Sequence, residues 1–525
     1  MLRISFYVLS VLALALIGWA APAHPEALYA LIVVAPLVLV GLYDIFVSHH
    51  NVLSNYPVIG HLRYMMEFIS PEIRQYFVES DKSGRPYTRQ QRGLIKARSY
   101  GGEAVHPFGT EYDVDEGGYK LALHSIAVKK VPESDARVSI GGPQCRRPYD
   151  SSRLNISAMS FGALSSHAVM AMNKGAKLGG FAQDTGEGGL TPYHLKYGAD
   201  LIWEIGSGYF GCRTPEGSFD DELFRTKACQ EVVRMIEIKL SQGAKPSHGG
   251  VLPGPKVNAE IAAIRGVPKG RDCISPAAHP EFDSPRGLLE FVKRLRGLCE
   301  GRPVGFKLCI GRRSEFLGIC KAMLETGILP DFITVDGAEG GTGAAPVEYS
   351  DRLGLMIDEG LSFVHNALVG CGLRDKIRLI ASGKITDGFD MMQKIALGAD
   401  VCNVARPMMF AVGCIQAQRC HTNTCPTGVA TQDSRRARAI NIDKRGEDVR
   451  RYHDATIRSF LDITGSVGAA HPDELHPEMV LRRQPDRTPR SYAKLYPPVA
   501  EGALLSDVLP ETFADDWAAA SADRF

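Results

Sequence analysis

Three cysteines lie within twelve residues of one another in the last quarter of the chain. Cys414, Cys420 and Cys425 follow the pattern C-x5-C-H-x3-C, and a proline follows the last of them. Such compact spacing lets one loop wrap an iron–sulfur cluster, and three ligands indicate a three-iron cluster. The alternatives are a zinc site that also uses His421, a disulfide, or inert buried thiols. His421 directly follows a cysteine, so it needs a tight turn to reach the same metal.

A second group of residues has the pattern of a phosphate site. Ser382, Gly383 and Lys384 stand in IASGKITDG, and Ala405 and Arg406 stand in CNVARPMM. Each group follows a short apolar run and precedes a helical pattern or a proline. Backbone N–H groups at such strand-to-helix turns bind anions, and the phosphate of flavin mononucleotide (FMN) fits there. A glycine at the end of a strand is, taken alone, also typical of a plain turn.

These residues need a scaffold that brings distant strand ends together. From Leu154 onward, short apolar runs alternate with helical patterns, which indicates parallel strands joined by helices. Eight such runs over about 250 residues fit a closed (β/α)8 barrel better than an open sheet, with the chemistry at the carboxyl ends of the strands. The expected strands are 155–162, 181–186, 201–208, 234–240, 303–311, 331–337, 376–383 and 399–405, and the expected helices include 165–179, 284–300, 314–327, 353–372 and 385–398.

The first fifty residues are far more apolar than the rest. Residues 4–20 and 27–47 each hold about the 17 to 25 apolar residues that a membrane-spanning helix needs. Basic residues occur at Arg3 and from Arg63 onward but not in the connecting loop, which places both flanks in the cytoplasm. We expect a transmembrane hairpin in the inner (cytoplasmic) membrane, multi-pass, with the catalytic domain facing the cytoplasm. A cleaved signal peptide is the competing interpretation, because residues 21–23 loosely fit a cleavage site.

Composition limits the remaining possibilities. The 525 residues are 45% hydrophobic and 23% charged, which excludes wholesale disorder and a polytopic transporter. Sixty basic residues stand against 59 acidic ones, and the resulting net charge of +1 gives no electrostatic case for a nucleic-acid partner. The 54 glycines, slightly over a tenth of the chain, exceed the average of about 7%. They require an explanation at the level of the backbone.

Eight motifs occur in the same order as in the flavin domain of glutamate synthases. They are ISAMSFGALS, DTGEGG, KLSQGAKP, GGVLPGPKV, FKL, DGAEGGTGAAP, ASGKITDG and the cysteine run. The chain resembles that family from about residue 155 to residue 432. The resemblance implies FMN and a [3Fe-4S] cluster as cofactors. It implies the reductive amination of 2-oxoglutarate by ammonia, through 2-iminoglutarate, to L-glutamate, with electrons passing through the cluster to FMN.

The resemblance also implies roles for single residues. Lys307 is expected beside N1 and the C2 carbonyl of the flavin, where a cation stabilises the reduced ring. Lys245 and Arg265 are expected to bind the carboxylates of the substrate, and Glu187 to stand at the mouth of the active site. A structural ion pair is the alternative for each of these four. The backbone expected around the flavin and its phosphate comprises Ala158, Met159, Ser160, Gly340, Gly341, Thr342, Ser382, Gly383, Lys384, Ala405 and Arg406.

The sequence departs from the family pattern in the substrate loop. His248 and Val251 stand where the family commonly has glutamate and glutamine. Loss of an amide aimed at the substrate costs about 1–3 kcal/mol and can change substrate preference. Two alternative functions follow: the same flavin and iron–sulfur chemistry on a different 2-oxo acid or amine, or a membrane-bound electron-transfer module without amination.

The expected architecture is α/β, an FMN-binding (β/α)8 TIM barrel preceded by an N-terminal two-helix transmembrane hairpin. The expected parts are the hairpin (1–50), a neck or solvated connector (51–150), the barrel with its iron–sulfur loop (151–432) and a C-terminal extension (433–525), in which 458–469 reads as a packed helix. No glutaminase domain and no nucleotide-binding glycine motif are recognised. The electrons are therefore expected from a separate donor, which is a ferredoxin, a reductase subunit or a membrane carrier.

Overall fold

The computed structural model describes residues 2–105 and 107–525. The chain folds as two compact units, residues 1–90 and residues 91–525. The boundary between them falls inside the segment 51–150. Residues 91–150 therefore belong to the unit that contains the barrel.

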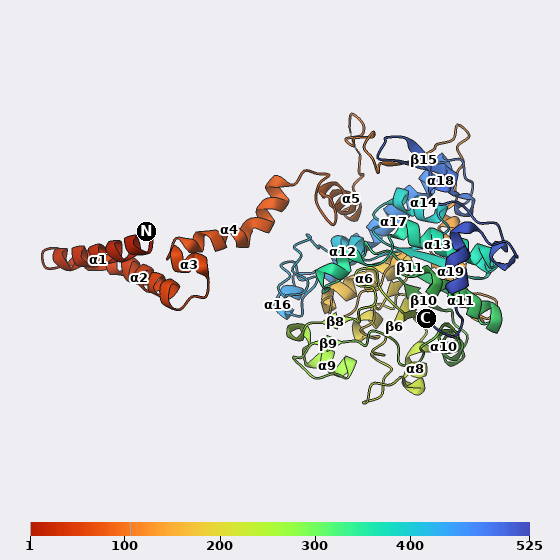
Figure 1. Cartoon of the computed structure of the whole chain (residues 1–525), viewed down its shortest axis with the longest axis horizontal. Helices are drawn as coiled ribbons and strands as arrows, with labels where there is room; N and C mark the ends of the chain where they lie inside the picture. Colours follow the sequence, from red (N-terminus) through yellow and green to blue (C-terminus); the bar gives the residue numbers. More distant parts are fainter. Residues whose placement is uncertain (1, 106) are drawn as a thin grey trace. The chain divides into compact units, whose positions relative to one another are not determined.

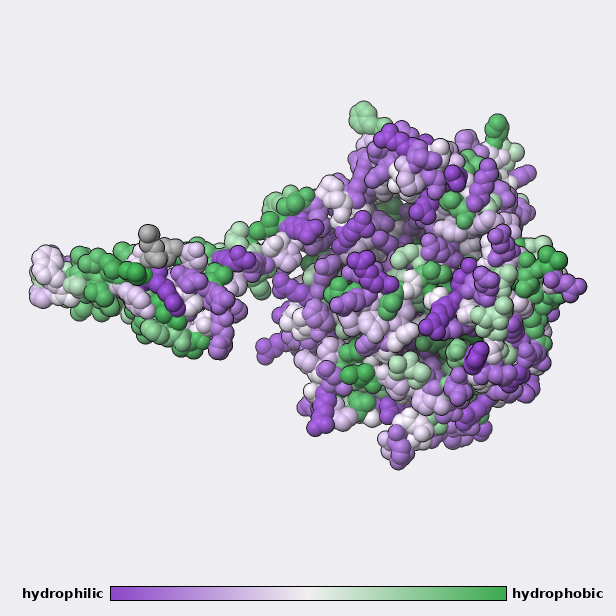
Figure 2. All heavy atoms as spheres, viewed as in Figure 1, coloured by the Kyte–Doolittle hydropathy of each residue, from purple (hydrophilic) through white to green (hydrophobic). Residues whose placement is uncertain are grey.

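The first unit contains two long apolar helices, α1 (Leu2–Ala20) and α2 (Leu31–Phe46), joined by a short 3-10 helix, η1 (Pro25–Ala30). Both apolar segments are long enough to cross a membrane, and a signal sequence near an N-terminus has the same length and composition. Two helices follow, α3 (Asn51–Asn55) and α4 (Gly60–Ile73), and then one π-helical turn, η2 (Arg74–Val78). Apolar side chains cover much of the surface of α1 and α2, which appears green in Figure 2.

The second unit is built around a closed barrel of eight parallel strands (Figure 1). The strands follow their order along the chain, and the last pairs with the first, with Cys402 beside Leu154. Each expected strand overlaps one barrel strand, so the (β/α)8 prediction is confirmed. The strands are β4 (Leu154–Ile156), β5 (Gln183–Asp184), β6 (Leu201–Ile205), β7 (Val233–Lys239), β10 (Val304–Leu308), β11 (Phe332–Asp336), β12 (Arg378–Ser382) and β13 (Val401–Val404).

Helices surround the barrel, and polar side chains fix where several of them begin. The hydroxyl of Ser165 accepts a hydrogen bond from the Ala168 N–H at the start of α6, and Asp387 caps α14 in the same way. The expected helix 385–398 begins three residues late because of this cap. The helices are α6 (Ser166–Gly179), α7 (Pro192–Leu195), α8 (Asp221–Ala228), α9 (Ala259–Arg265), α10 (Pro285–Leu298), α11 (Arg313–Thr326), α12 (Val347–Arg352), α13 (Ile357–Gly370), α14 (Gly388–Ala396) and α15 (Arg406–Ala411).

A β-hairpin of β2 (Arg137–Ile140) and β3 (Tyr149–Ser152) closes the amino-terminal end of the barrel. Its buried side chains form one apolar cluster with residues at the starts of the barrel strands. The members are Val138, Ile140, Tyr149, Ala182, Ile202, Met235, Phe332, Ile380 and Val401. The carboxyl end is thus the end at which the barrel interior meets its functional loops.

The C-terminal extension packs back onto the barrel. Its main helix, α17 (Ile442–Ser466), lies against α6 and α14. The expected helix 458–469 thus overlaps only the last part of a longer helix. The first turns of α17 carry many charged residues, which leave only a narrow apolar face in the sequence pattern. Further on, β14 (Val480–Arg483) pairs with β1 (Lys120–Ala122) and with β15 (Pro489–Ser491). The remaining helices are α5 (Arg89–Ser99), α16 (Ser434–Ala437), α18 (Tyr492–Leu495) and α19 (Glu511–Ala519).

Candidate active site

The segment expected to face the flavin follows β4 at the carboxyl end of the barrel. Ala158, Met159 and Ser160 are half-buried there. The next barrel loop passes directly over this segment at Gly186, where a Cβ atom would lie 2.6 Å from the Ser160 nitrogen. Gly186 also has a φ of +64°, a left-handed conformation that glycine adopts at little cost. The close backbone approach explains why the DTGEGG motif has a glycine at this position.

The loops after β11 and β13 meet where the phosphate is expected. The Arg406 Nη2 donates a hydrogen bond of 2.7 Å to the Glu339 carbonyl oxygen. A Cβ atom on Gly341 would lie 2.9 Å from the Arg406 side chain. Gly340 and Ala405 border this contact and are half-buried, and Thr342 is exposed. The structure therefore places Gly340, Gly341 and Arg406 together, as a cationic cradle for a phosphate requires.

The loop after β12 lies beside the flavin segment. The Ser382 hydroxyl is 3.3 Å from the Ser157 hydroxyl, which links the ends of β12 and β4. Gly383 is buried and follows directly. Lys384 adopts a φ of +52°, a left-handed conformation that a non-glycine residue adopts at a cost of about 1–3 kcal/mol. The strain lies at the loop expected to bind the phosphate.

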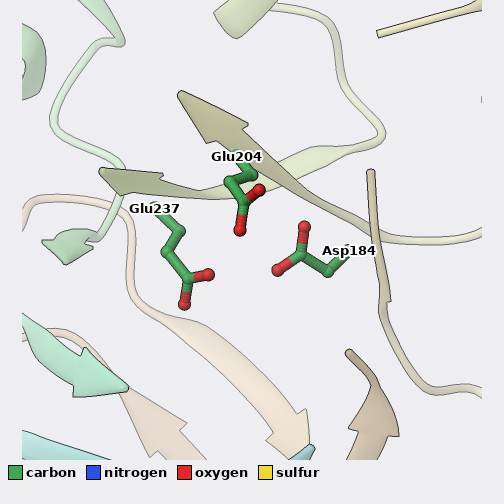
Figure 3. A group of neighbouring side chains, drawn as sticks. All are labelled: Asp184, Glu204 and Glu237. Atoms are coloured by element: carbon green, nitrogen blue, oxygen red, sulfur yellow. The ribbon is translucent and has the colours of Figure 1, made fainter. Parts of the chain in front are cut away.

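Lys307 points into the barrel interior. Its ammonium forms a short ion pair with Glu204 and a second one, at 3.1 Å, with Glu237. Asp184 lies beside them, and the three carboxylates have ligand atoms within 4.8 Å of one another. Figure 3 shows these carboxylates converging from three barrel strands. Lys307 thus forms the ion pair inside the barrel that was the alternative interpretation. Its expected role beside the flavin stays a prediction.

This interior cluster holds three carboxylates but one ammonium. Burial lowers the pKa of a lysine, but Glu204, Glu237 and Asp184 outweigh burial and raise the pKa of Lys307 well above its usual value. Burial, together with Glu237 and Glu204, raises the pKa of Asp184 well above its usual value. Burial raises the pKa of Glu204 as well, although Lys307 and Lys239 act in the opposite direction, so we infer that a proton in this cluster resides on Asp184. In this cluster Lys307 occupies the cationic position that a metal ion would otherwise take.

Glu187 stands at the mouth of the barrel in a second ion pair, with Lys239 at the end of β7. The Ser275 hydroxyl donates a hydrogen bond of 2.8 Å to the same carboxylate. Burial alone raises the pKa of a carboxylate, but Lys239 and Ser275 outweigh it and lower the pKa of Glu187 to about 2. His279 contacts the carbonyl of Lys239 through Nε2 at 2.8 Å. Glu187 is thus a fixed negative charge at neutral pH.

Lys245 and Arg265, the two expected substrate cations, have different surroundings. Lys245 is 1% exposed, and its Nζ donates a hydrogen bond of 3.0 Å to the Ala344 carbonyl. Burial and the nearby Lys239 charge lower the pKa of Lys245 to about 8. Arg265 donates to the Phe161 carbonyl at 3.2 Å, and its guanidinium lies 5.1 Å from the centre of the Phe210 ring. Arg265 thus contacts the end of the segment 158–160 and the residue after it, and its role as a substrate cation stays a prediction.

The substrate loop lies directly over Glu187. A Cβ atom on Gly250 would lie 1.5 Å from the Glu187 Oε1, so a side chain there would displace the ion-paired carboxylate or the loop. Val251 begins the short strand β8 (Val251–Leu252), which pairs with β9 (Cys273–Ile274). The His248 ring makes an edge contact with Tyr349, with ring centres 5.2 Å apart. The two departures from the family pattern thus occupy the loop that covers the mouth.

The cysteine loop follows α15. All twelve cysteines are free thiols, and Cys425 is buried while Cys414 and Cys420 are half-buried. Gln416, Gln418 and Asn423 in this loop have left-handed backbone conformations, with φ of +60°, +54° and +62°. The three sulfur atoms do not converge as closely as the interior carboxylates of the described chain do. His421 is exposed. A donor set of three soft thiols on one curved loop fits an iron–sulfur cluster chemically.

Lys256 lies next to the cysteine loop and was not identified from the sequence. It is 2% exposed, and its Nζ donates to the carbonyl oxygens of Ala163, Cys420 and Ala430 at 2.6, 3.3 and 3.4 Å. Burial lowers its pKa to about 8, although Cys420 and Cys425 act in the opposite direction. Among the ion pairs of the described residues, none joins a carboxylate to Lys256. This buried cation therefore favours an anionic group in the cysteine loop.

More than half of the chain matches a known family. The conserved region of glutamate synthase matches residues 133–470. The chain belongs to the glutamate synthase family. One family member, the glutamate synthase large subunit-like protein YerD of Bacillus subtilis, is 37% identical over 87% of this chain and 94% of its own length.

Other relatives match this chain over only part of their own length. An archaeal NADPH glutamate synthase from Methanocaldococcus jannaschii is 35% identical over 60% of this chain and 58% of its own length. The NADPH glutamate synthase large chain of Bacillus subtilis is 33% identical over 61% of this chain, which spans 21% of that protein. A flavocytochrome b2 structure has a TM-score of 0.42 and 13% identity over 79% of this chain and 85% of its own. A mandelate oxidase structure has a TM-score of 0.40 and 14% identity over 77% and 96%.

Several site residues of this glutamate synthase family member were not identified from the sequence. They are Lys239, Ser275, His279 and Lys256 at the mouth and the cysteine loop, and Asp184, Glu204 and Glu237 inside the barrel. A signal existed for the two interior glutamates. Each glutamate has an apolar residue on both sides within a short strand, in LIWEI and MIEIK. Such a residue points into the barrel, where it must find a partner.

Proposed function

We propose that the barrel binds FMN and a [3Fe-4S] cluster and catalyses the reductive amination of 2-oxoglutarate, through 2-iminoglutarate, to L-glutamate. The observation that carries this proposal is the meeting of three sets of residues at one barrel end. These are the flavin segment 158–160 under Gly186, the cradle of Gly341 and Arg406, and the charged mouth of Glu187 and Lys239. The family membership and the names of the relatives support the same activity.

Glycines and one arginine would hold the flavin. Gly341 lies against Arg406, whose charge suits a phosphate, and Gly340 precedes it. Residues 158–160 offer backbone groups to the ring. When bound, FMN supplies a hydride to the imine carbon. The side chains of this protein would bind, orient and protonate the substrate.

The mouth residues would orient and protonate the substrate. Lys245 has a pKa of about 8, so its ammonium binds a substrate carboxylate and can also hold or release a proton near neutral pH. Glu187, fixed as an anion by Lys239, keeps an ammonium ion or iminium group close to the barrel mouth. The balance is that 2-oxoglutarate and ammonia lose one water to give 2-iminoglutarate. This imine then takes up two electrons and two protons to give glutamate.

The cysteine loop would receive electrons from outside. Cys414, Cys420 and Cys425 would bind the cluster, and Lys256 would balance part of its negative charge. The electron donor would be a separate ferredoxin, reductase subunit or membrane carrier. The apolar hairpin would hold the chain in the inner (cytoplasmic) membrane, with the barrel on the cytoplasmic side, because the basic residues flank the hairpin on that side.

The test uses the full chain purified in detergent. Flavin absorbance and bound iron are expected, together with anaerobic oxidation of the dithionite-reduced protein by 2-oxoglutarate plus ammonium and the appearance of L-glutamate. Protein without flavin or iron contradicts the cofactor assignment. Reoxidation by a different 2-oxo acid or amine, but not by 2-oxoglutarate with ammonium, means that the enzyme uses a different substrate. The departures from the family pattern at His248 and Val251 would then explain the altered preference. Reoxidation by a membrane quinone alone identifies an electron-transfer module.

A further inference from the structure

Helix α4 carries an apolar stripe along one side. Leu62, Met66, Ile69 and Ile73 follow one another at spacings of four, three and four residues, which places them on one face of a helix. Met65 extends the same face. Leu62 is 58% exposed and Met66 is 51% exposed, so no part of the first unit covers the stripe fully.

The side of α4 away from the stripe carries charged side chains together with Tyr64 and Phe68, and Phe68 is 67% exposed. Arg63 and Glu67 form an ion pair of 2.9 Å across one turn, and both side chains are exposed. Glu72, which lies beside Met65, is balanced by Arg74, the first residue of η2. A helix with an apolar stripe on one side and charged and aromatic side chains on the other suits a membrane–water interface, where aromatic rings are also enriched. Because its charges cancel, its attachment depends on apolar burial and not on anionic lipids.

The start of α4 is fixed to the end of the apolar hairpin. Asp44, near the end of α2, is 0% exposed. Its carboxylate accepts a hydrogen bond of 2.9 Å from the Val58 N–H and one from the His61 Nε2 at 2.9 Å. This contact explains an acidic residue in an otherwise apolar helix. It also places the first residues of α4 next to the last turn of α2.

A second contact ties the other helix of the hairpin to the same level. The Arg3 Nη2 donates a hydrogen bond of 2.7 Å to the Ser54 hydroxyl in α3. The polar ends of α1 and α2 and the start of α4 therefore share one polar layer. In a chain whose hairpin spans a membrane, that layer is the headgroup region.

We propose that α4 lies in the interfacial layer of the membrane, with Leu62, Met66, Ile69 and Ile73 toward the acyl chains and Arg63 and Glu67 toward water. This inference rests on the proposed membrane hairpin. The partner is a lipid surface of either headgroup charge. The helix would hold the chain at a fixed depth before the barrel unit begins.

Spin-label accessibility in the full chain, reconstituted into lipid nanodiscs, tests the proposal. Labels are placed by Met66→Cys on the apolar face and by Glu67→Cys on the polar face. The spectrum of the labelled parent chain is subtracted to remove the signal of native thiols. We expect oxygen to relax the label at position 66 more than a water-soluble nickel chelate does, and the reverse at position 67. The same result is expected in neutral and in anionic lipid.

Two results at position 66 overturn the proposal. High accessibility to the nickel chelate means that the apolar face is in water. Low accessibility to both reagents means that protein covers it, either the barrel unit or a second copy of the chain. A third label, from Val40→Cys in α2, separates this proposal from the hairpin. If the nickel chelate reaches position 40, the hairpin proposal itself fails, whereas protection at 40 with exposure at 66 overturns only the interfacial helix.

Discussion

The Nζ of Lys256 donates a hydrogen bond of 3.3 Å to the carbonyl oxygen of Cys420. The same ammonium donates to Ala163, just beyond the flavin segment. One buried charge thus joins the cysteine loop to the loop after β4. In the proposed reaction these two loops hold the flavin and the iron–sulfur cluster, between which electrons pass.

Removal of this charge should weaken the proposed cluster. We expect Lys256→Gln to retain iron about 10- to 100-fold less tightly, because neighbours of metal ligands typically contribute that much to metal affinity. Iron content after dialysis against a chelator measures the effect. The control is Lys269→Gln, which removes an exposed charge from the same segment. Equal iron retention in both variants would show that Lys256 has no such role.

The interior cluster should tolerate replacement of its protonated carboxyl group but not the loss of its ammonium. Asp184 keeps a proton, so Asp184→Asn should change the free energy of unfolding by less than about 1.5 kcal/mol. Lys307→Met leaves Glu204 and Glu237 without their cation and should cost about 3–5 kcal/mol. Urea unfolding at pH 7 compares the two variants. A similar cost for both contradicts the assignment of the proton to Asp184.

The Glu187–Lys239 pair should contribute to the free energy of unfolding in a way that depends on pH. The pKa of Glu187 is about 2 in the folded chain and about 4.5 when unfolded. Its contribution, about 3 kcal/mol from this difference, is therefore present above pH 4.5 and is lost as the pH falls toward 2. Glu187→Gln removes the contribution, so the difference in unfolding free energy from the parent chain should shrink between pH 5 and pH 3. A difference that does not depend on pH refutes the ion-pair account.

Substrate binding should depend on the protonation of Lys245. Its pKa of about 8 means that the ammonium is present below pH 8 and is lost above it. We expect kcat/KM for the 2-oxo acid to fall about tenfold per pH unit above pH 8. Lys245→Met should lower kcat/KM and remove this limb of the pH profile, whereas Lys245→Arg should move it to higher pH. An unchanged profile in Lys245→Met means that another group titrates there.

The loop over the mouth should reject even one methyl group. A Cβ atom on Gly250 overlaps the Glu187 carboxylate. Gly250→Ala should therefore displace the loop, lower turnover strongly and reduce stability by about 1–3 kcal/mol. Gly343→Ala is the matched control, because nothing lies within 4 Å of a Cβ at that position. Turnover with 2-oxoglutarate plus ammonium and thermal unfolding of both variants measure the contrast.

The eight strands could be predicted because each is a short apolar run next to a glycine or polar turn. The partners of Lys307 could not, because Glu204 and Glu237 come from other strands and meet the lysine only through the register of the closed barrel. The same holds for Glu187 and Lys239. The role of Asp44 depends on contacts with Val58 and His61 that no periodicity reveals. The length of α17 was underestimated because charges obscure its apolar face.

The pairing of β1 with β14 joins segments that lie more than three hundred residues apart, with Ala122 opposite Val480. During synthesis on the ribosome, the apolar hairpin emerges long before the strand that completes this sheet. Chains are made at about 5–20 residues per second, so many seconds separate the two events. The hairpin can therefore reach its final environment while this sheet is still incomplete, and the second unit finishes folding after the hairpin has been made.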